Sequence, residues 1–179
     1  KCQKIIGIDV DKAAQENPFL DEFRSISQND LWPIDTKSVD LCVCDYVLEH
    51  IEEPDLFFSE CARVLKTDGY LCIRTPNLFS YIGLISKIIP YSRHFSIISK
   101  VQNAHRDNKD VFPVFYRCNT IWAIAGALRK HGFEFTVYGY EAEPSYLSFS
   151  GLFYFLGVLH QRFAPNAIKV GILAFGKKL

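Results

Sequence analysis

An alternation of apolar strand patterns with an amphipathic helix pattern constrains the fold of this chain more than any other feature. Residues 39–44 form an apolar run suited to a buried strand, residues 54–66 carry apolar side chains at helical spacing, and residues 70–74 predict another strand. Pro54 suits a first helical turn, and a turn at Asp68 follows the helix. Because a strand, a helix and a strand in this order favour parallel strands with a right-handed crossover, an α/β domain with a mostly parallel sheet is predicted.

Further elements are predicted on both sides of this unit. Strand patterns occur at four more places, residues 3–9, 23–27, 133–140 and 167–175. The first of these reads as buried on both faces, and the last two are expected to pair in antiparallel fashion. A helix is predicted from a cap at Asn119 to a stop at Gly132. In the helix of residues 54–66, Glu60 and Arg63 are expected on the solvent side.

The composition describes one globular domain with reduced cysteines. A chain of 179 residues with 49% hydrophobic side chains can form one sizeable core. Twenty basic residues balance twenty acidic ones, so no basic excess argues for nucleic acid. The six cysteines include no CxxC pair, which predicts free thiols and no metal site. Such thiols and the lack of a signal-peptide pattern predict a cytoplasmic location.

Polar side chains gather where the predicted strands end. Asp9, Asp45 and Thr75 each mark the carboxyl end of a strand pattern, and Glu49 and His50 follow the second of these at once. Carboxyl ends of parallel strands share one edge of the sheet, and ligands in such folds bind beyond that edge. The alternative is a helix start whose first turn is simply solvated, so both interpretations stay open for Glu49 and His50.

Three stretches resemble class I S-adenosylmethionine-dependent methyltransferases, in the branch often labelled type 11. They are GID at residues 7–9, DLCVCDYVLEHIEEP at 40–54 and FFSECARVLKTDGYLCIRTPN at 57–77. The resemblance implies a Rossmann-like, three-layer α/β fold whose sheet is mostly parallel with an antiparallel last strand. It also implies S-adenosylmethionine as cofactor, bound across the carboxyl ends of the first strands.

The same resemblance assigns site residues by position. Asp9 matches the acid that holds both ribose hydroxyls, because a carboxylate offers acceptors to two adjacent donors. Asp45 and Tyr46 match positions that face the methionine part and the methyl group, and His50 is the candidate general base. The full predicted cofactor-binding set is Asp9, Val10, Gln28, Asn29, Asp30, Leu31, Asp45, Tyr46, Glu49 and His50. Asp9 as a helix cap, and residues 28–31 as a plain polar turn, are the alternatives.

One departure from the family pattern concerns the glycine-rich loop. By analogy with dinucleotide-binding folds, this loop should lie roughly 20 residues before the ribose-binding acid. Only eight residues precede Asp9, and Gly7 lies inside the strand pattern. An N-terminal truncation that removes the first strand and this loop is therefore predicted. A non-catalytic remnant of the fold, acting as an interaction module, is the alternative function.

The resemblance predicts residues 1–179 to be one methyltransferase-like domain, with 78–118 and 141–166 as insertions at the acceptor site. The expected acceptor is a small molecule or a lipid- or glycan-linked group. Residues 144–159 contain no charged side chain. Three interpretations of this aromatic segment stay open: a lid over the acceptor, a homodimer surface, or a peripheral membrane contact through residues 144–163 at the inner face of a membrane.

Overall fold

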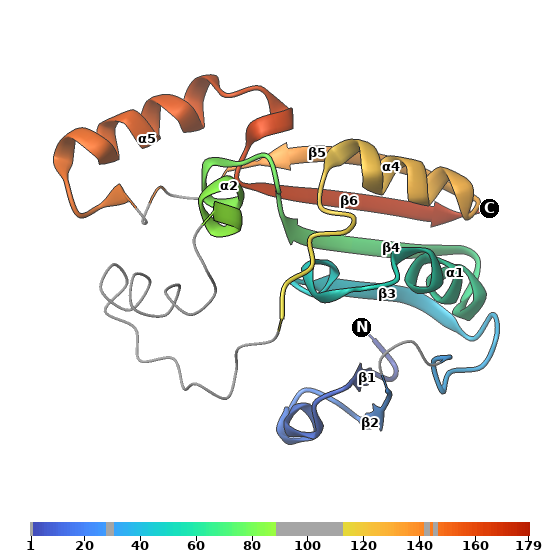
Figure 1. Ribbon diagram of the computed structural model, residues 1–179. Helices are drawn as coiled ribbons and strands as arrows, with labels where there is room; N and C mark the ends of the chain where they lie inside the picture. The colour runs from blue at the N-terminus through green and yellow to red at the C-terminus, as the bar shows by residue number, and fades with distance from the viewer. Residues whose placement is uncertain (1, 28–30, 89–112, 142–143, 145–146) are drawn as a thin grey trace.

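The strands form two sheets in the computed structural model, which describes residues 2–27, 31–88, 113–141, 144 and 147–179 (Figure 1). The strands are β1 (Ile6–Asp9), β2 (Glu22–Ser25), β3 (Val39–Asp45), β4 (Leu65–Pro76), β5 (Phe133–Tyr140) and β6 (Gly171–Lys178). The smaller sheet is a parallel β1-β2 pair, and the larger has the order β3-β4-β6-β5. β3 and β4 are parallel, whereas β6 is antiparallel to both its neighbours. The predicted α/β class and the antiparallel last strand are confirmed.

Helices lie between these strands. The α-helices are α1 (Pro54–Val64), α2 (Tyr81–Ile88), α4 (Ile121–Lys130) and α5 (Gly151–Phe163), and short 3-10 helices are η1 (Lys12–Glu16), η2 (Leu48–His50) and η5 (Asn166–Ile168). The bounds of β5 match the prediction. β6 begins later than the pattern at residue 167, because residues 166–168 form η5.

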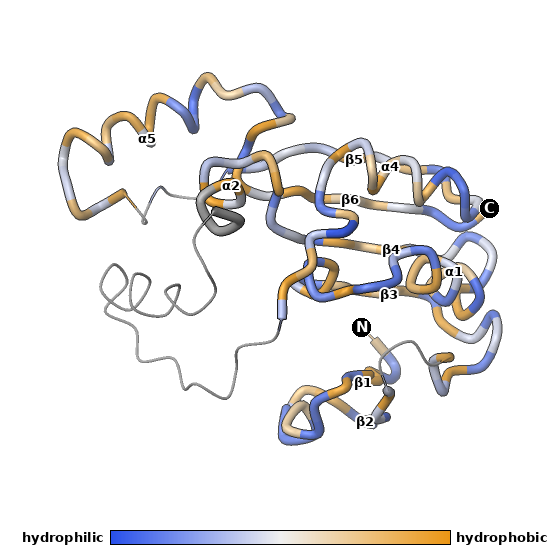
Figure 2. Tube along the Cα trace, viewed as in Figure 1, coloured by the Kyte–Doolittle hydropathy of each residue, from blue (hydrophilic) through white to orange (hydrophobic). Residues whose placement is uncertain are grey.

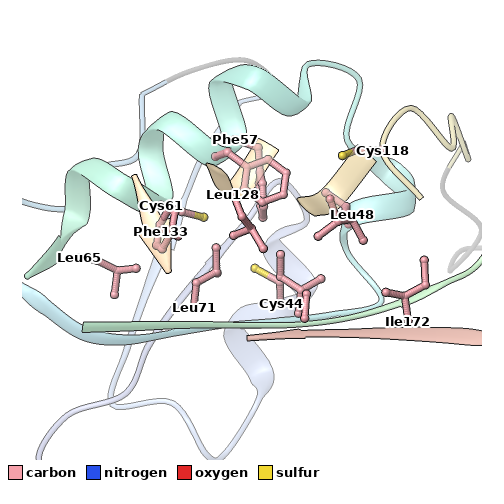
Figure 3. Close-up of a cluster of buried hydrophobic side chains, with 14 residues drawn as sticks. Cys44, Leu48, Phe57, Cys61, Leu65, Leu71, Cys118, Leu128, Phe133 and Ile172 are labelled. Carbon is pink, nitrogen blue, oxygen red and sulfur yellow. The ribbon is translucent and has the colours of Figure 1, made fainter. Parts of the chain in front are cut away.

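The core lies between the larger sheet and the two helices α1 and α4. Figure 3 shows its side chains on one side of the strands, and Phe58, Leu71, Ile124 and Leu128 are fully buried there. At roughly 1.5–3 kcal/mol for each buried large apolar side chain, this cluster supplies most of the hydrophobic stabilisation. It fixes β3 and β4, and therefore fixes the edge at which both strands end.

The opposite face of the same sheet is open in the described residues. Side chains on a strand alternate between the two faces, so the neighbours of buried Cys44, Leu71 and Ile73 point the other way. Val43 is 67% exposed on this face, and Tyr70 is half exposed. β1 pairs with β2 and not with β3, so one edge of β1 and one edge of β3 are unpaired within the described residues. The predicted N-terminal truncation stays a prediction.

Three details of the sequence-based prediction are wrong. Residues 3–9 are not buried on both faces: the strand β1 begins at Ile6, and its residues are half-buried or exposed, because only β2 pairs with it. Asn119 does not cap α4; Thr120 does, since its hydroxyl accepts from the Ala123 amide. The third is the solvent-facing position of Glu60 and Arg63: Glu60 is buried and pairs with Arg63.

Candidate functional site

The carboxyl ends of β3, β4 and β5 meet at one edge of the larger sheet. Asp45 at the end of β3 is in register with Arg74 on β4. Both oxygens of the Asp45 carboxylate accept from the Arg74 guanidinium, and this ion pair raises the pKa of Arg74. The pair is half exposed, so it remains accessible to a charged or polar ligand at the edge.

Two tyrosines lie beside this ion pair. Tyr46 adopts a positive φ of 54°, which is uncommon for a residue other than glycine, and its amide donates to the Arg74 carbonyl at 2.9 Å. The Arg74 guanidinium lies 5.1 Å from the centre of the Tyr46 ring. The hydroxyls of Tyr46 and Tyr140 are 3.2 Å apart. The pKa of Tyr140 is raised mainly by burial and secondly by this contact with Tyr46. The four side chains therefore form one polar cluster across three strands.

Glu49 is buried rather than directed at an open cleft. Its side chain is 5% exposed, and its carboxylate accepts from the Thr75 hydroxyl at 3.1 Å. The Asn119 side-chain amide in turn donates to the same hydroxyl at 2.6 Å. Burial is the main reason why the pKa of Glu49 is raised. The backbone carbonyl of Glu49 also accepts from the amides of Phe115 and Tyr116, so this residue holds the segment that leads into α4.

His50 is fixed to the same segment through one ring nitrogen. Its Nδ1 lies 2.8 Å from the Pro113 carbonyl oxygen. Because a carbonyl can only accept, Nδ1 carries the hydrogen, and in a neutral imidazole Nε2 then carries the lone pair. This is the tautomer that a general base acting through Nε2 requires.

An open pocket lies between residues that follow β1 and β2 and residues that follow β3. It has a cavity volume of about 80 Å³ and is lined by Val10, Ile26, Ser27, Trp32, His50, Ile51, Glu52, Glu53, Leu56 and Phe57. Two of the predicted site residues, Val10 after β1 and His50 after β3, therefore meet in one place. Pockets that enclose a ligand of nucleoside size measure roughly 300–1,000 Å³. The pocket as it stands is smaller than this range.

Asp9 lies beside this pocket in sequence and is exposed at the end of β1. Its Oδ1 accepts from the Asp11 amide at 2.9 Å, whereas Asp11 is the residue that caps η1. The predicted alternative role of Asp9 as a helix cap is thus taken by Asp11. The Asp9 carboxylate has further acceptor positions besides this contact, as an acid that holds two ribose hydroxyls would need.

The predicted site residues do not all lie together: Asp9 is exposed at the end of β1, and Glu49 is buried beside Thr75. Val10 and His50 share the pocket, Asp45 and Tyr46 belong to the polar cluster, and Leu31 is exposed next to Trp32. Gln28, Asn29 and Asp30 lie outside the described residues.

Sequence reasoning missed three partners of the site: Arg74, Tyr140 and Asn119. Arg74 lies near the end of β4, of which the predicted strand at residues 70–74 covers only a part, and Tyr140 ends β5, whose bounds match the prediction. That position was a usable signal, because parallel strands bring their carboxyl ends together. Asn119 gave no such signal, since an asparagine before a helix reads as a cap.

A buried ion pair holds the loop that supplies Trp32 to the pocket. Glu60 is 2% exposed, and its carboxylate accepts from Arg63 at 2.6 and 2.7 Å and from the Trp32 amide at 2.7 Å. Arg63 also donates to the carbonyls of Trp32 and Ile34. The Arg63 contact lowers the pKa of Glu60. The prediction that Glu60 and Arg63 face solvent is therefore wrong, because loop carbonyls and the Trp32 amide take the place of water around them.

Replacing Glu49 with glutamine is expected to flatten the pH dependence of stability. The folded-state pKa of Glu49 is raised, so from about pH 4.5, where the unfolded chain loses this proton, the free energy of unfolding falls as the pH rises. Glutamine can still accept from Thr75 and has no proton to lose. Urea unfolding at a series of pH values from about 4 to 8 measures the slope.

Glu60→Gln is the matched control, with the opposite sign. The pKa of Glu60 is lowered, so its ionic stabilisation is present above about pH 4.5 and is lost as the pH falls through the folded-state pKa. The variant should therefore lose stability at neutral pH. An unchanged pH slope in Glu49→Gln would contradict the assignment of a buried, easily protonated carboxyl.

Comparisons with known proteins show what the sequence and the fold of this chain are similar to. Residues 1–73 match the Methyltransferase domain family. A probable S-adenosylmethionine-dependent methyltransferase of Mycolicibacterium smegmatis is 33% identical over 85 residues, 45% of this chain and 32% of that protein. A protein of Mycobacterium tuberculosis with the same description is 41% identical over 49 residues, 27% of this chain and 18% of that protein. The match thus spans about a third or less of these curated relatives.

A solved structure extends the comparison to nearly the whole chain. The S-adenosylmethionine-dependent methyltransferase of Thermotoga maritima superposes with a TM-score of 0.63 over 98% of this chain and 73% of its own, at 15% identity. At this identity the superposition shows a common fold. The chain is thus similar to methyltransferases over residues 1–73, and it shares the fold of an S-adenosylmethionine-dependent methyltransferase over nearly its whole length.

Proposed function

We propose that the protein transfers a methyl group from S-adenosylmethionine to an acceptor bound at the carboxyl edge of β3, β4 and β5. One observation carries this proposal. The chain leaving β3 passes from the polar cluster at Asp45 and Tyr46 to His50, which lines the same pocket as Val10 at the end of β1. Asp45 and Arg74 line a second pocket, so the proposed ligand reaches from the pocket at Val10 and His50 to the strand end at Asp45, beyond the carboxyl ends of the strands.

The residues at these strand ends have different roles in the proposed reaction. The Asp9 carboxylate accepts from ribose hydroxyls, and Val10, Leu31 and Trp32 give apolar contact to the base. The bound sulfonium supplies an electrophilic carbon, so the protein mainly has to position a nucleophile, which can be worth roughly 7–11 kcal/mol of the barrier. His50 Nε2 accepts the proton that an acceptor hydroxyl or amine loses, a contribution of about 10²–10⁴-fold.

The acceptor proposed here is a small molecule or a lipid- or glycan-linked group. The Asp45–Arg74 pair and the Tyr46 and Tyr140 hydroxyls offer both donors and acceptors at the sheet edge. α2, which follows β4 directly beyond this edge, contacts α5 through the Tyr81 and His160 rings, whose centres are 5.4 Å apart. An acceptor with an apolar part could therefore lie between the polar edge and these helices.

Calorimetry with S-adenosylmethionine and with NADH tests the cofactor assignment. Binding of S-adenosylmethionine with no NADH binding is the expected result, because both ligands carry an adenosine but only S-adenosylmethionine has the methionine part that Asp45 and Tyr46 are proposed to face. The pocket of about 80 Å³ must widen on binding, so protease protection of the loop at residues 31–36 should increase with the ligand. Binding of NADH alone would overturn the proposal.

A non-catalytic module of the same fold is the second candidate. The observation that favours it is the division of the strands into two sheets, with β1 and β3 unpaired along the edges they would share with an intervening strand. If neither cofactor binds to the protein, this candidate replaces methyl transfer. If S-adenosylmethionine binds and its methyl group is turned over with any acceptor, this candidate is excluded.

A further inference from the structure

The helix α5 is attached to the domain by one narrow face. Gly157 is its only buried residue, and a Cβ at this position would lie 2.6 Å from the Pro144 Cβ and 2.9 Å from the Leu147 Cδ1. Close approach of α5 to this segment thus depends on a residue without a side chain. His160, on the flank of the same face, has its Nδ1 3.2 Å from Glu141 Oε1. These contacts fix which side of α5 points away from the domain.

The side pointing away is apolar. At about 100° per residue, one continuous stripe lies roughly opposite Gly157 and consists of Leu152, Phe155, Leu156, Leu159 and Phe163. All five side chains are exposed, Phe163 by 71% and Leu152 by 66%. Figure 2 shows α5 as a largely hydrophobic segment set apart from the sheet. An ordinary surface helix has the reverse arrangement, with its apolar stripe facing the core.

The apolar surface of α5 continues beyond this stripe. Phe153 and Val158 are exposed on either side of it, and Phe149 precedes the helix and packs against Phe153. The arc from Val158 through the stripe to Phe153 therefore covers more than half of the circumference of α5, and only Arg162 and His160 interrupt its apolar side chains. A groove on a protein partner contacts a narrower arc of a helix, whereas a lipid phase surrounds whatever part of a helix enters it. The breadth of this surface favours lipid.

The charges around α5 point the same way. Residues 144–179 contain no Asp or Glu. Arg162 lies at the end of the helix with its guanidinium 5.6 Å from the centre of the Phe163 ring, and Lys169 follows shortly afterwards. Basic side chains near an apolar helix face suit anionic headgroups, and Glu141, the acid that pairs with His160 and interacts with Lys169, lies on the side of α5 that faces the domain.

The length of α5 sets how it can meet a bilayer. Thirteen residues at about 1.5 Å each give roughly 20 Å, against a hydrocarbon core of about 30 Å. In the described part of the chain, no helix has the length and apolar character needed to cross a membrane. A helix of this kind lies in the plane of the interface.

We propose that α5 docks the protein on an anionic lipid surface, with the stripe at residues 152–163 buried among the acyl chains and Arg162 and Lys169 at the headgroups. Because α5 contacts α2, which follows β4, docking would bring the carboxyl edge of the larger sheet close to the lipid. The docking does not depend on cofactor binding, so it can be tested independently of methyl transfer.

Flotation with phosphatidylcholine vesicles, with and without phosphatidylglycerol, tests this proposal on the purified protein without cofactor. We expect binding that is stronger on the anionic vesicles. Leu152→Glu should reduce the bound fraction at least about tenfold, since a leucine leaves the apolar phase and a negative charge is added. Arg162→Ala should reduce only the anionic preference, by about fivefold.

Leu179→Glu is the matched control, because Leu179 is 69% exposed and lies at the far end of β6 from α5 (Figure 1). It should bind vesicles like the unchanged protein. Thermal unfolding of each variant is measured to check that it is folded. The proposal is overturned if the unchanged protein does not bind vesicles, or if Leu152→Glu binds as well as the control. It is also overturned if Leu152→Glu instead abolishes a dimer seen by sedimentation, which would assign the stripe to a second copy of the chain.

Discussion

Arg63→Ala is expected to lower the free energy of unfolding by about 2–3 kcal/mol. Removal of one partner from a fully buried ion pair costs about 3–5 kcal/mol, because the other charge stays buried without compensation. Glu60 is 2% exposed and would keep only the Trp32 amide as a partner, but Arg63 itself is 29% exposed in its side chain. Water that enters where the guanidinium stood would solvate part of the Glu60 charge. The expected loss therefore lies at or below the lower end of the range for a fully buried pair.

The same substitution should also weaken cofactor binding. Arg63 donates to the carbonyls of Trp32 and Ile34, so its loss releases the loop that lines the pocket. Urea unfolding gives the stability change, and calorimetry gives the change in affinity.

Lys66→Ala is the matched control for Arg63→Ala. Lys66 also pairs with an aspartate, Asp40, but the two side chains are 46% and 84% exposed. A surface pair of this kind contributes about 0–1 kcal/mol, so the control should remain within that range. If both variants lost the same small amount of stability, the Glu60–Arg63 pair would be no more than a surface contact, and the loop would depend on other interactions.

The local patterns of this sequence predicted elements well where tertiary contacts reinforce them. β5 and the start of α1 at Pro54 agree with the sequence pattern, because their apolar side chains alternate or repeat toward one core. The pattern failed at Glu60, since a charged residue reads as solvent-facing whatever packs over it. Only the three-dimensional position of the 32–34 loop reveals that Glu60 has a set of donors which substitute for water.

The site was predictable to the extent that strand ends determine it. Asp45, Tyr46 and His50 could be chosen because they follow an apolar run, and the parallel register then brings Arg74 opposite Asp45. The burial of Glu49 could not be predicted in this way. It results from residues 113–119 returning to the β3 end, and no local pattern encodes that return. The same return explains why His50 has a defined tautomer in the structure.

The division of the strands into two sheets also bears on what the site can do. Each sheet carries one half of the proposed cofactor contacts: Asp9 and Val10 follow β1, and Asp45 to His50 follow β3. The relative position of the halves depends on the loop fixed by Arg63 and on the pocket contacts between Val10, Trp32 and His50. Cofactor binding should therefore stabilise the contact between the two sheets, by an amount that rises with the logarithm of the ligand concentration once this exceeds the dissociation constant.

Asp9→Asn is expected to raise the dissociation constant for S-adenosylmethionine about 100-fold. Hydrogen bonds to a charged group contribute about 1.5–3 kcal/mol each, and two ribose hydroxyls donate to this carboxylate in the proposed complex. Asparagine offers one acceptor oxygen and turns an NH₂ group toward the second hydroxyl. It can still accept from the Asp11 amide, so the local turn should be kept. Calorimetry measures the affinity, and thermal unfolding without ligand should show little change.

Asp11→Asn separates this effect from a general disturbance of the β1 end. Asp11 stands two residues away and caps η1 by accepting from the Ala13 amide at 2.9 Å, a bond that asparagine preserves. Its variant should bind the cofactor with nearly unchanged affinity. Equal losses in the two variants would mean that negative charge near the pocket matters and that no carboxylate grips the ribose. Because the assignment of the first strand end rests on that grip, such a result would move the nucleoside away from β1 and leave only the β3 side of the site.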